Sequence, residues 1–382
     1  MHKVTRSLQR SIALLGAISA LLFLHPAAGT AAGSIWTIQR TPNRSNDFNE
    51  LTAVATVSSS DVWAVGTFRG SSPAFRTLTE HFDGTSWHSV RSPNVGTSNN
   101  ELNAVAASSS SDVWAAGFEF GGSADRTLIE HWNGTRWSVV PSPNSGSTSN
   151  DLRGIAAISP TDAWAVGQVP GGAFPPLAEH WNGTAWSIVP TPSPLGGGFF
   201  TSVAAISSND VWALGATNEE ATLAEHWDGS TWSIVSTPAV IGDDFFFGAA
   251  SISTSDVWAV GSQGSSTLTE HWDGAQWAVV PSPNPLPSNG NNFLTGVTAV
   301  SSTDVWAVGA TLDFLQGGLE QTVTLRWDGT AWNVIASPNR GTGSNVLLGV
   351  DSPGGGVVFA AGTFAQVPAN TNRTLVLETA QG

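Results

Sequence analysis

A six-residue block recurs along this chain, and this repetition constrains the fold more than any other feature. The block reads Asp-Val-Trp-Ala-Val-Gly at 61–66 and returns five more times with small substitutions. A worn seventh copy, Val-Val-Phe-Ala-Ala-Gly, stands at 357–362, and successive copies are 46 to 53 residues apart. Periods of this length are typical of folds in which each repeat is one supersecondary unit that stacks against its neighbours.

Each repeat contains four runs that resemble short strands. In the first repeat these are Leu51–Val57, Val62–Gly66, Leu78–Phe82 and Trp87–Val90, rich in Val, Trp, Thr and Ala. Gly, Pro, Asn and Ser separate the runs, as expected at turns. The Asp-Gly pair at 83–84, with Asn-Gly in two other repeats, predicts a tight turn between the third and fourth strands. The repeat unit is therefore a four-stranded antiparallel sheet.

The strand count predicts how the chain closes. It begins with a fourth strand, Trp36–Gln39, and ends after a third strand, Leu375–Thr379. Pairing these two segments completes a seventh sheet and removes two exposed edges. We therefore predict an all-β fold: a seven-bladed β-propeller of four-stranded blades, closed by the N-terminal strand joining the C-terminal blade.

One position of each first strand carries only small residues, which predicts that the first strands converge on a central channel. These residues are Ala53, Ala104, Gly154, Ser202, Gly248, Gly296 and Gly349.

The N-terminus has the three parts of an export signal. Lys3, Arg6 and Arg10 precede the apolar run Ile12–Leu24, and small residues follow at Ala27–Ala32. We predict a signal peptide at 1–32, a single propeller domain at 33–382 and a secreted, extracellular protein with no membrane span after cleavage. The run is shorter than the ~20 residues of a membrane helix, and a retained anchor is the alternative.

Composition narrows the possible partners. Cleavage removes three cations and no acid, leaving eleven arginines against 29 acidic residues and a net charge of −18. An acidic surface repels phosphate backbones, so we expect no nucleic-acid partner. We expect a monomer without cofactor or metal, whose partner is a glycan or an extracellular protein.

The turn and the period carry a family resemblance. The Asp-Gly-Thr-x-Trp turn resembles a shortened Asp-box of sialidase-like propellers, and the period resembles that of kelch and galactose-oxidase-like propellers. The resemblance covers the whole predicted domain and implies the propeller fold, which hosts many functions. The kelch Gly-Gly-Tyr motif is missing. Sialidases use a tyrosine nucleophile and galactose oxidase uses tyrosine and cysteine, and this chain has neither residue.

Two repeated residue types could suggest function, but we interpret both as scaffold. All 18 tryptophans occupy repeat positions, which favours packing between blades over sugar stacking. Five Glu-His pairs stand at one position of the third strand, and five copies around a ring cannot converge on one reacting atom. We predict that each histidine bonds to the aspartate of its Asp-Val-Trp block, because buried polar groups need partners. The histidines are His81, His131, His180, His226 and His271.

The repeat is broken just before each first strand, on the face where loops vary in length. Three neighbouring blades carry carboxylates there and the next three carry phenylalanines: Glu50, Glu101, Asp151, Phe199, Phe245 and Phe293. Three loops of neighbouring blades end in Arg-Thr-Leu, at Arg76, Arg126 and Arg373. We predict a ligand site at this rim, with the arginines keeping the carboxylates ionised. The alternative is ordinary surface ion pairs, with phenylalanines that cap the core.

Three functions remain open. The residues favour a non-catalytic binding or scaffold propeller for extracellular glycan or a surface partner, and the rim alone suffices for it. A secreted glycan hydrolase that uses two carboxylates is the enzymatic alternative, although nothing in the spacing selects a pair. The third is a structural component of an envelope or matrix.

Overall fold

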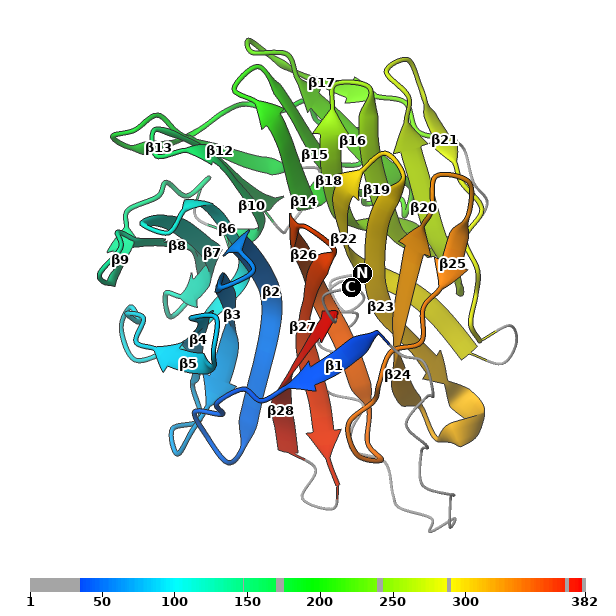
Figure 1. The fold of residues 1–382 in the computed structure, drawn as a ribbon. Helices are drawn as coiled ribbons and strands as arrows, with labels where there is room; N and C mark the ends of the chain where they lie inside the picture. Colours follow the sequence, from blue (N-terminus) through cyan, green and yellow to red (C-terminus); the bar gives the residue numbers. More distant parts are fainter. Residues whose placement is uncertain are drawn as a thin grey trace.

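The computed structural model describes residues 35–146, 148–169, 175–238, 243–286, 290–367 and 371–379. The predicted signal peptide lies outside the described residues. The chain forms seven four-stranded antiparallel sheets, arranged as blades around a central channel (Figure 1). The predicted seven-bladed β-propeller is confirmed.

Blades 1 to 6 use their strands in chain order from the channel outwards. Their bounds are β2 (Phe48–Ser58), β3 (Asp61–Arg69), β4 (Phe75–Phe82), β5 (Trp87–Val90); β6 (Asn100–Ser109), β7 (Asp112–Phe120), β8 (Asp125–Trp132), β9 (Trp137–Val140); β10 (Asp151–Ser159), β11 (Asp162–Gln168), β12 (Leu177–Trp181), β13 (Trp186–Ile188); β14 (Gly198–Ser207), β15 (Asp210–Thr217), β16 (Thr222–Trp227), β17 (Trp232–Val235); β18 (Asp244–Ser253), β19 (Asp256–Gln263), β20 (Ser266–Trp272), β21 (Trp277–Val279); β22 (Gly290–Ser301), β23 (Asp304–Asp313), β24 (Leu319–Trp327) and β25 (Trp332–Val334). A short 3₁₀ helix, η1 (Phe314–Gln316), follows β23.

Blade 7 is assembled from both ends of the chain. It orders β26 (Asn345–Gly354), β27 (Val357–Gln366), β28 (Thr371–Thr379) and β1 (Trp36–Gln39) from the channel outwards. Trp36 pairs with Thr379 and Gln39 with Val376, so blue β1 lies beside red β28 in Figure 1. The predicted closure is confirmed.

The inner strands approach each other where the sequence is restricted to small residues. A Cβ placed on Gly248 would lie 3.0 Å from the Cα of Gly296, and one on Gly349 would lie 2.9 Å from the Cα of Ala53. Larger side chains cannot enter such contacts without moving the backbone. The small residues therefore set the diameter of the channel.

Tryptophans fill the space between blades, as predicted. Trp63 of blade 1 is 1% exposed and packs edge-on against Trp137 of blade 2, with ring centroids 5.2 Å apart. Equivalent pairs recur at each of the next five junctions, the last being Trp306 of blade 6 with Trp36 of blade 7. Edge-to-face pairs are favoured by the aromatic quadrupole and bury large apolar areas. These indoles belong to the scaffold.

The predicted histidine–aspartate bond is present in all five blades that carry both residues. The Nε2–Oδ1 distances are 2.7 to 2.9 Å, and each imidazole lies 4.2 to 4.6 Å from the tryptophan of its own second strand. The histidines are half-buried. The Asp-Gly turns also form as predicted: Asp83 accepts hydrogen bonds from Thr85 and from the Ser86 amide.

Candidate ligand site at the channel mouth

The predicted carboxylates and phenylalanines of the rim occupy one structural position together with Val346. We call this position the rim layer. Each pairs with the residue after the glycine of its second strand: Glu50 pairs with Thr67, Phe199 with Ala216 and Val346 with Thr363. The carbonyl of Glu50 lies only 2.1 Å from where a Cβ on Gly66 would stand. That glycine is therefore required for the rim residue to sit where it does.

A β-bulge adds a second ring of side chains that sequence reasoning missed. In every blade the register shifts just after the leucine or phenylalanine that follows the rim residue. The residue two positions after the rim residue shares its face of the strand. We call these residues the bulge layer: Thr52, Asn103, Arg153, Thr201, Phe247, Thr295 and Leu348.

The bulge layer joins neighbouring blades. Thr52 donates its hydroxyl to the carbonyl of Leu102 at 2.7 Å, and Thr201 and Thr295 repeat this bond to Phe246 and Leu347. Each bond links one inner strand to the next around the channel. The bulge layer therefore holds the inner strands of blades 1 and 2, 4 and 5, and 6 and 7 together beside the rim layer.

In the acidic half of the mouth, the pKa of Glu50 is raised to about 8, first by burial and second by the negative charge of Glu101. Burial also raises the pKa of Glu320, on β24, to about 8, with Glu50 adding to the rise and a hydrogen bond from Ser344 opposing it. Glu50 therefore interacts electrostatically with both Glu101 and Glu320. In its protonated form it can donate as well as accept a hydrogen bond.

Asp151 differs from the two glutamates because it is buried and well partnered. Arg153 Nε lies 3.2 Å from one oxygen, Gln168 Nε2 lies 3.3 Å from the same oxygen, and Asn103 Nδ2 lies 3.1 Å from the other. The guanidinium of Arg153 also covers the ring of Phe199 at 5.5 Å. Arg153 thus occupies the boundary between the two halves and leaves Asp151 and Phe199 little surface for a ligand.

The aromatic half stays accessible in the next two blades. Phe245 is half-buried and stacks on Phe247 of the bulge layer, with centroids 6.2 Å apart and planes 5° from parallel. Phe293 is also half-buried, while Val346 is 1% exposed. Partial exposure therefore remains at Glu50 and Glu101 on one side and at Phe245, Phe247 and Phe293 on the other.

Two of the three predicted arginines, Arg76 and Arg373, are held by loop carbonyls. Arg76 donates to the carbonyls of Gly96, Thr97 and Ser98, in the loop that enters blade 2. Arg373 donates in the same way to the carbonyls of Ser45 and Asn46, in the loop that enters blade 1.

Burial raises the pKa of Glu119, and the positive charge of Arg126 partly opposes this rise. Among described residues no ion pair joins Arg76 to Glu50. The expectation that arginine keeps the rim carboxylates ionised is wrong for Glu50, because its surroundings are enclosed and acidic. Sequence position alone did not show that the loop carbonyls compete for Arg76 and Arg373.

Two further features of the described residues concern metal sites and membrane spans. No group of three or more His, Asp or Glu side chains is placed to hold a metal ion there. Within those same ranges, no helix has the length and apolar character that crossing a membrane requires.

Comparison with known proteins supports the propeller fold but does not assign the chain to a family. No protein-family model matches the sequence, and no curated protein is a significant match. A solved structure titled "YCF48 bound to D1 peptide" is similar at a TM-score of 0.59 and 12% identity, covering 92% of this chain and 98% of that one. The fucose-specific lectin of Aleuria aurantia is similar at 0.50 and 13% identity, covering 78% and 97%. Both similarities support the β-propeller fold.

Several residues of the mouth escaped sequence reasoning for different reasons. Arg153 and Phe247 stand two positions after Asp151 and Phe245, so strand periodicity could have identified them. Glu320 lies near the start of β24, far from Glu50 in sequence. Only the three-dimensional fold brings the two carboxyl groups near each other. No sequence signal marks that proximity.

Proposed function

We propose that this chain is a secreted, non-catalytic binding propeller that recognises an extracellular saccharide at the channel mouth. One observation carries the proposal: the rim layer is acidic over one arc of three neighbouring blades and aromatic over the next three. A rigid spacer has no need for such a division. The concave mouth of a ring is also where a propeller can surround a ligand.

The chemistry of the two arcs favours a neutral sugar. A protonated Glu50 beside Glu101 offers a donor and acceptors to hydroxyl groups without requiring a cation. Phe245 and Phe293 offer ring faces to the C–H surface of a pyranose, and each contributes ~1–2 kcal/mol when it is covered. The two similar propellers are titled as binding a peptide and as a fucose-specific lectin, which supports binding as the role.

The test is a glycan array followed by calorimetry on the best neutral ligand. Glu101→Ala and Phe245→Ala should each weaken binding about tenfold, the equivalent of ~1.4 kcal/mol. Glu219→Ala and Phe314→Ala are matched controls, because they remove an exposed carboxylate and an exposed ring outside the rim layer. Wild-type affinity in both rim variants, with melting temperatures intact, would refute a site at the mouth.

A carboxylate-dependent glycan hydrolase is a second candidate, and the raised pKa of Glu50 favours it. A proton held near neutral pH beside a second carboxylate is the arrangement that supplies a general acid and its partner. Under this function Glu50→Gln abolishes cleavage of the bound glycan and retains binding. If the wild-type protein leaves that glycan intact after prolonged incubation, the hydrolase is rejected and the binding role stands.

A further inference from the structure

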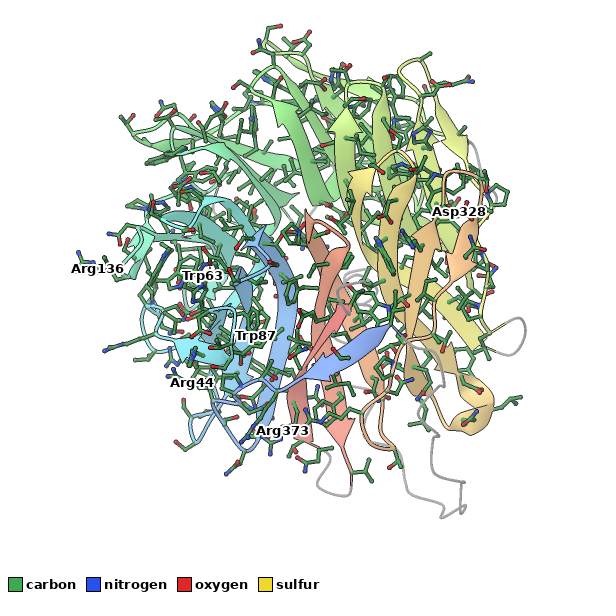
Figure 2. All side chains as sticks on the ribbon, in the orientation of Figure 1. Arg44, Trp63, Trp87, Arg136, Asp328 and Arg373 are labelled. Atoms are coloured by element: carbon green, nitrogen blue, oxygen red, sulfur yellow. The ribbon has the colours of Figure 1, made fainter. Side chains whose placement is uncertain are left out.

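A pocket of about 360 Å³ lies on blade 1, separate from the rim layer. Its walls come from β4, from β5 and from the segment that follows β5, at residues 91–96. Arg44 completes it from the connection between β1 and β2, which exists in this position only because the ring is closed. Figure 2 shows Arg44 over blade 1, away from Arg136 at the outer end of blade 2. The volume falls in the ~300–1,000 Å³ range of small-molecule sites.

The charge of this pocket is opposite to that of the protein. Arg44, Arg76 and Arg91 line it, three of the eleven arginines that follow the predicted signal peptide. No aspartate or glutamate lines it. Arg69, Arg153 and Arg326 each form an ion pair with an aspartate, whereas Arg44, Arg76 and Arg91 form none among the described residues. Three unneutralised guanidinium groups in an acidic chain create a local field that attracts an anion.

Two of the three side chains are already held in place. Arg76 is fixed by the carbonyls of residues 96–98. Arg44 donates to Ser89 Oγ at 3.1 Å, and its guanidinium lies 5.3 Å from the Phe68 ring centroid. Arg91 is exposed on the same wall. Guanidinium groups held in advance bind a planar carboxylate with little ordering cost, because the two fork geometries match.

The rest of the lining and its surroundings favour a sugar over a lone ion. Ser89 and Asn94 supply a hydroxyl and an amide group, and Phe68 supplies a ring. The hydroxyls of Thr77 and Ser92 are buried and bond to each other. A second hollow of about 520 Å³ adjoins through Arg44 and is lined by Ser45, Asn46, Asp47, Gly70 and Ser71. A ligand longer than one ring can therefore continue from the first hollow into the second.

We propose that this arginine pocket binds the carboxylate of a uronic acid unit within an acidic saccharide. The inference does not rest on the neutral-saccharide site at the channel mouth, because its residues lie outside the rim and bulge layers. It adds a second binding site, selected by charge, to a propeller whose net charge repels acidic polymers elsewhere. Binding should weaken as salt rises, since exposed ion pairs are screened.

The probe is tetragalacturonate, measured by calorimetry at low salt and neutral pH. Wild-type protein should bind it, and the fully methyl-esterified tetramer should not bind, because esterification removes the charge and keeps the ring hydroxyls. Arg91→Gln and Arg44→Gln should each weaken binding about tenfold or more, the loss expected for a hydrogen bond to a charged group. Arg136→Gln removes the same charge at an exposed turn and should leave the affinity unchanged.

Three outcomes overturn the proposal. They are equal affinity for the acid and its methyl ester, wild-type affinity in both Arg91→Gln and Arg44→Gln, and equally tight binding of sodium sulfate, which indicates a site for inorganic anions. Thermal melts confirm that each variant is folded. Glu101→Ala and Phe245→Ala should bind tetragalacturonate normally, so failure at the channel mouth is distinguishable from failure here.

Discussion

Blades 1 to 5 and blades 6 and 7 solve the same packing problem with different side chains. In the first five, histidine bonds to aspartate and stacks on tryptophan, and a glutamate beside it is 0% exposed. In blade 6, Arg326 takes the histidine position, bonds to Asp304 at 2.8 Å and lies 5.2 Å from the Trp306 ring centroid. One planar cation thus replaces both contacts of the histidine.

Blade 7 uses neither solution. Val357, Phe359 and Glu378 stand where the other blades carry aspartate, tryptophan and histidine or arginine. Instead Asp351 on the inner strand accepts bonds from the amide and hydroxyl of Thr56 in blade 1, at 2.7 and 2.8 Å, and from Thr298 in blade 6 at 3.2 Å. The polar network has moved from within a blade to the junctions between blades.

The buried glutamates sharpen the contrast. Glu80, Glu130, Glu179, Glu225 and Glu270 have no side-chain hydrogen-bond partner among described residues, and burial raises the pKa of each. Leu325 and Leu377 occupy this position in blades 6 and 7 and are equally buried. The environment is therefore one that suits a leucine, and a glutamate is tolerated there as the neutral acid.

The largest expected effect separates the closing blade from the others. Deleting residues 35–40 removes β1, reopens two sheet edges and uncovers Trp306, so the protein should lose cooperative unfolding and aggregate. Light scattering and thermal melts measure this. Restoring the strand after the C-terminus through an Asp-Gly-Thr-Ser turn should recover most of the melting temperature. An unchanged melt after the deletion would show that β1 is dispensable.

The next effect is a dependence of stability on pH that arises in blades 1 to 5. The buried glutamates have folded-state pKa values above the unfolded value of 4.5, and three are about 8. The folded protein then binds more protons than the unfolded chain between these values. Their contribution to the free energy of unfolding is therefore complete below about pH 4.5, declines as the pH rises, and is lost once the pH has passed about 8.

Urea unfolding should accordingly give a lower free energy of unfolding at pH 8.5 than at pH 5. The double variant Glu179→Gln with Glu225→Gln keeps the shape of the neutral acid and should show a shallower decline. A flat profile in the wild-type protein would mean that the glutamates are not protonated.

Removing one histidine should cost less than removing a strand. His131→Ala leaves Asp112, which is 4% exposed, with only the Ser108 hydroxyl as a side-chain donor. The free energy of unfolding should fall by ~1–3 kcal/mol. His131→Arg copies blade 6 and should recover part of this loss, whereas Glu378→Ala in blade 7 should change stability little. Equal losses in blades 2 and 7 would contradict the comparison.

The smallest effect is a gain. Glu130→Leu places the side chain of blades 6 and 7 in blade 2, and it should raise the free energy of unfolding at pH 8 by on the order of 1 kcal/mol, since it removes an unpartnered buried polar group. Leu325→Glu is the reciprocal change and should lower it. A loss with Glu130→Leu would reveal a partner for that carboxyl.

Repetition made the scaffold predictable from the sequence. The closure of β1 on β28, the histidine–aspartate bonds and the turn at Asp83 each follow from counting equivalent positions. Of the candidate site, only the part at equivalent repeat positions was predictable. The rim layer was identified because six equivalent residues fall into a block of three carboxylates and a block of three phenylalanines.

What escaped prediction depends on geometry that no single repeat encodes. Arg153 lies at the β-bulge, where it contacts both Asp151 and Phe199. The orientation of Arg76 is set by its hydrogen bonds to loop carbonyls. Arg44 and Arg91 stand 47 positions apart and line one pocket only because the closing connection crosses blade 1. Such contacts arise between irregular segments, whose paths local sequence does not determine.

The strand that closes the ring, β1, also affects the order in which the blades can be completed during folding. The hydroxyl of Thr37 bonds to the carbonyl of Glu378, 341 positions away, so β1 is synthesised first and finds its partner last. Contacts of such separation form slowly because a long loop must close before they contribute. Until β28 has formed, β1 remains an unpaired strand. It can then pair with the incomplete blade 7 of another chain. Crowded chains can exchange this strand, so refolding at high concentration should give domain-swapped dimers, and dilution should give monomers.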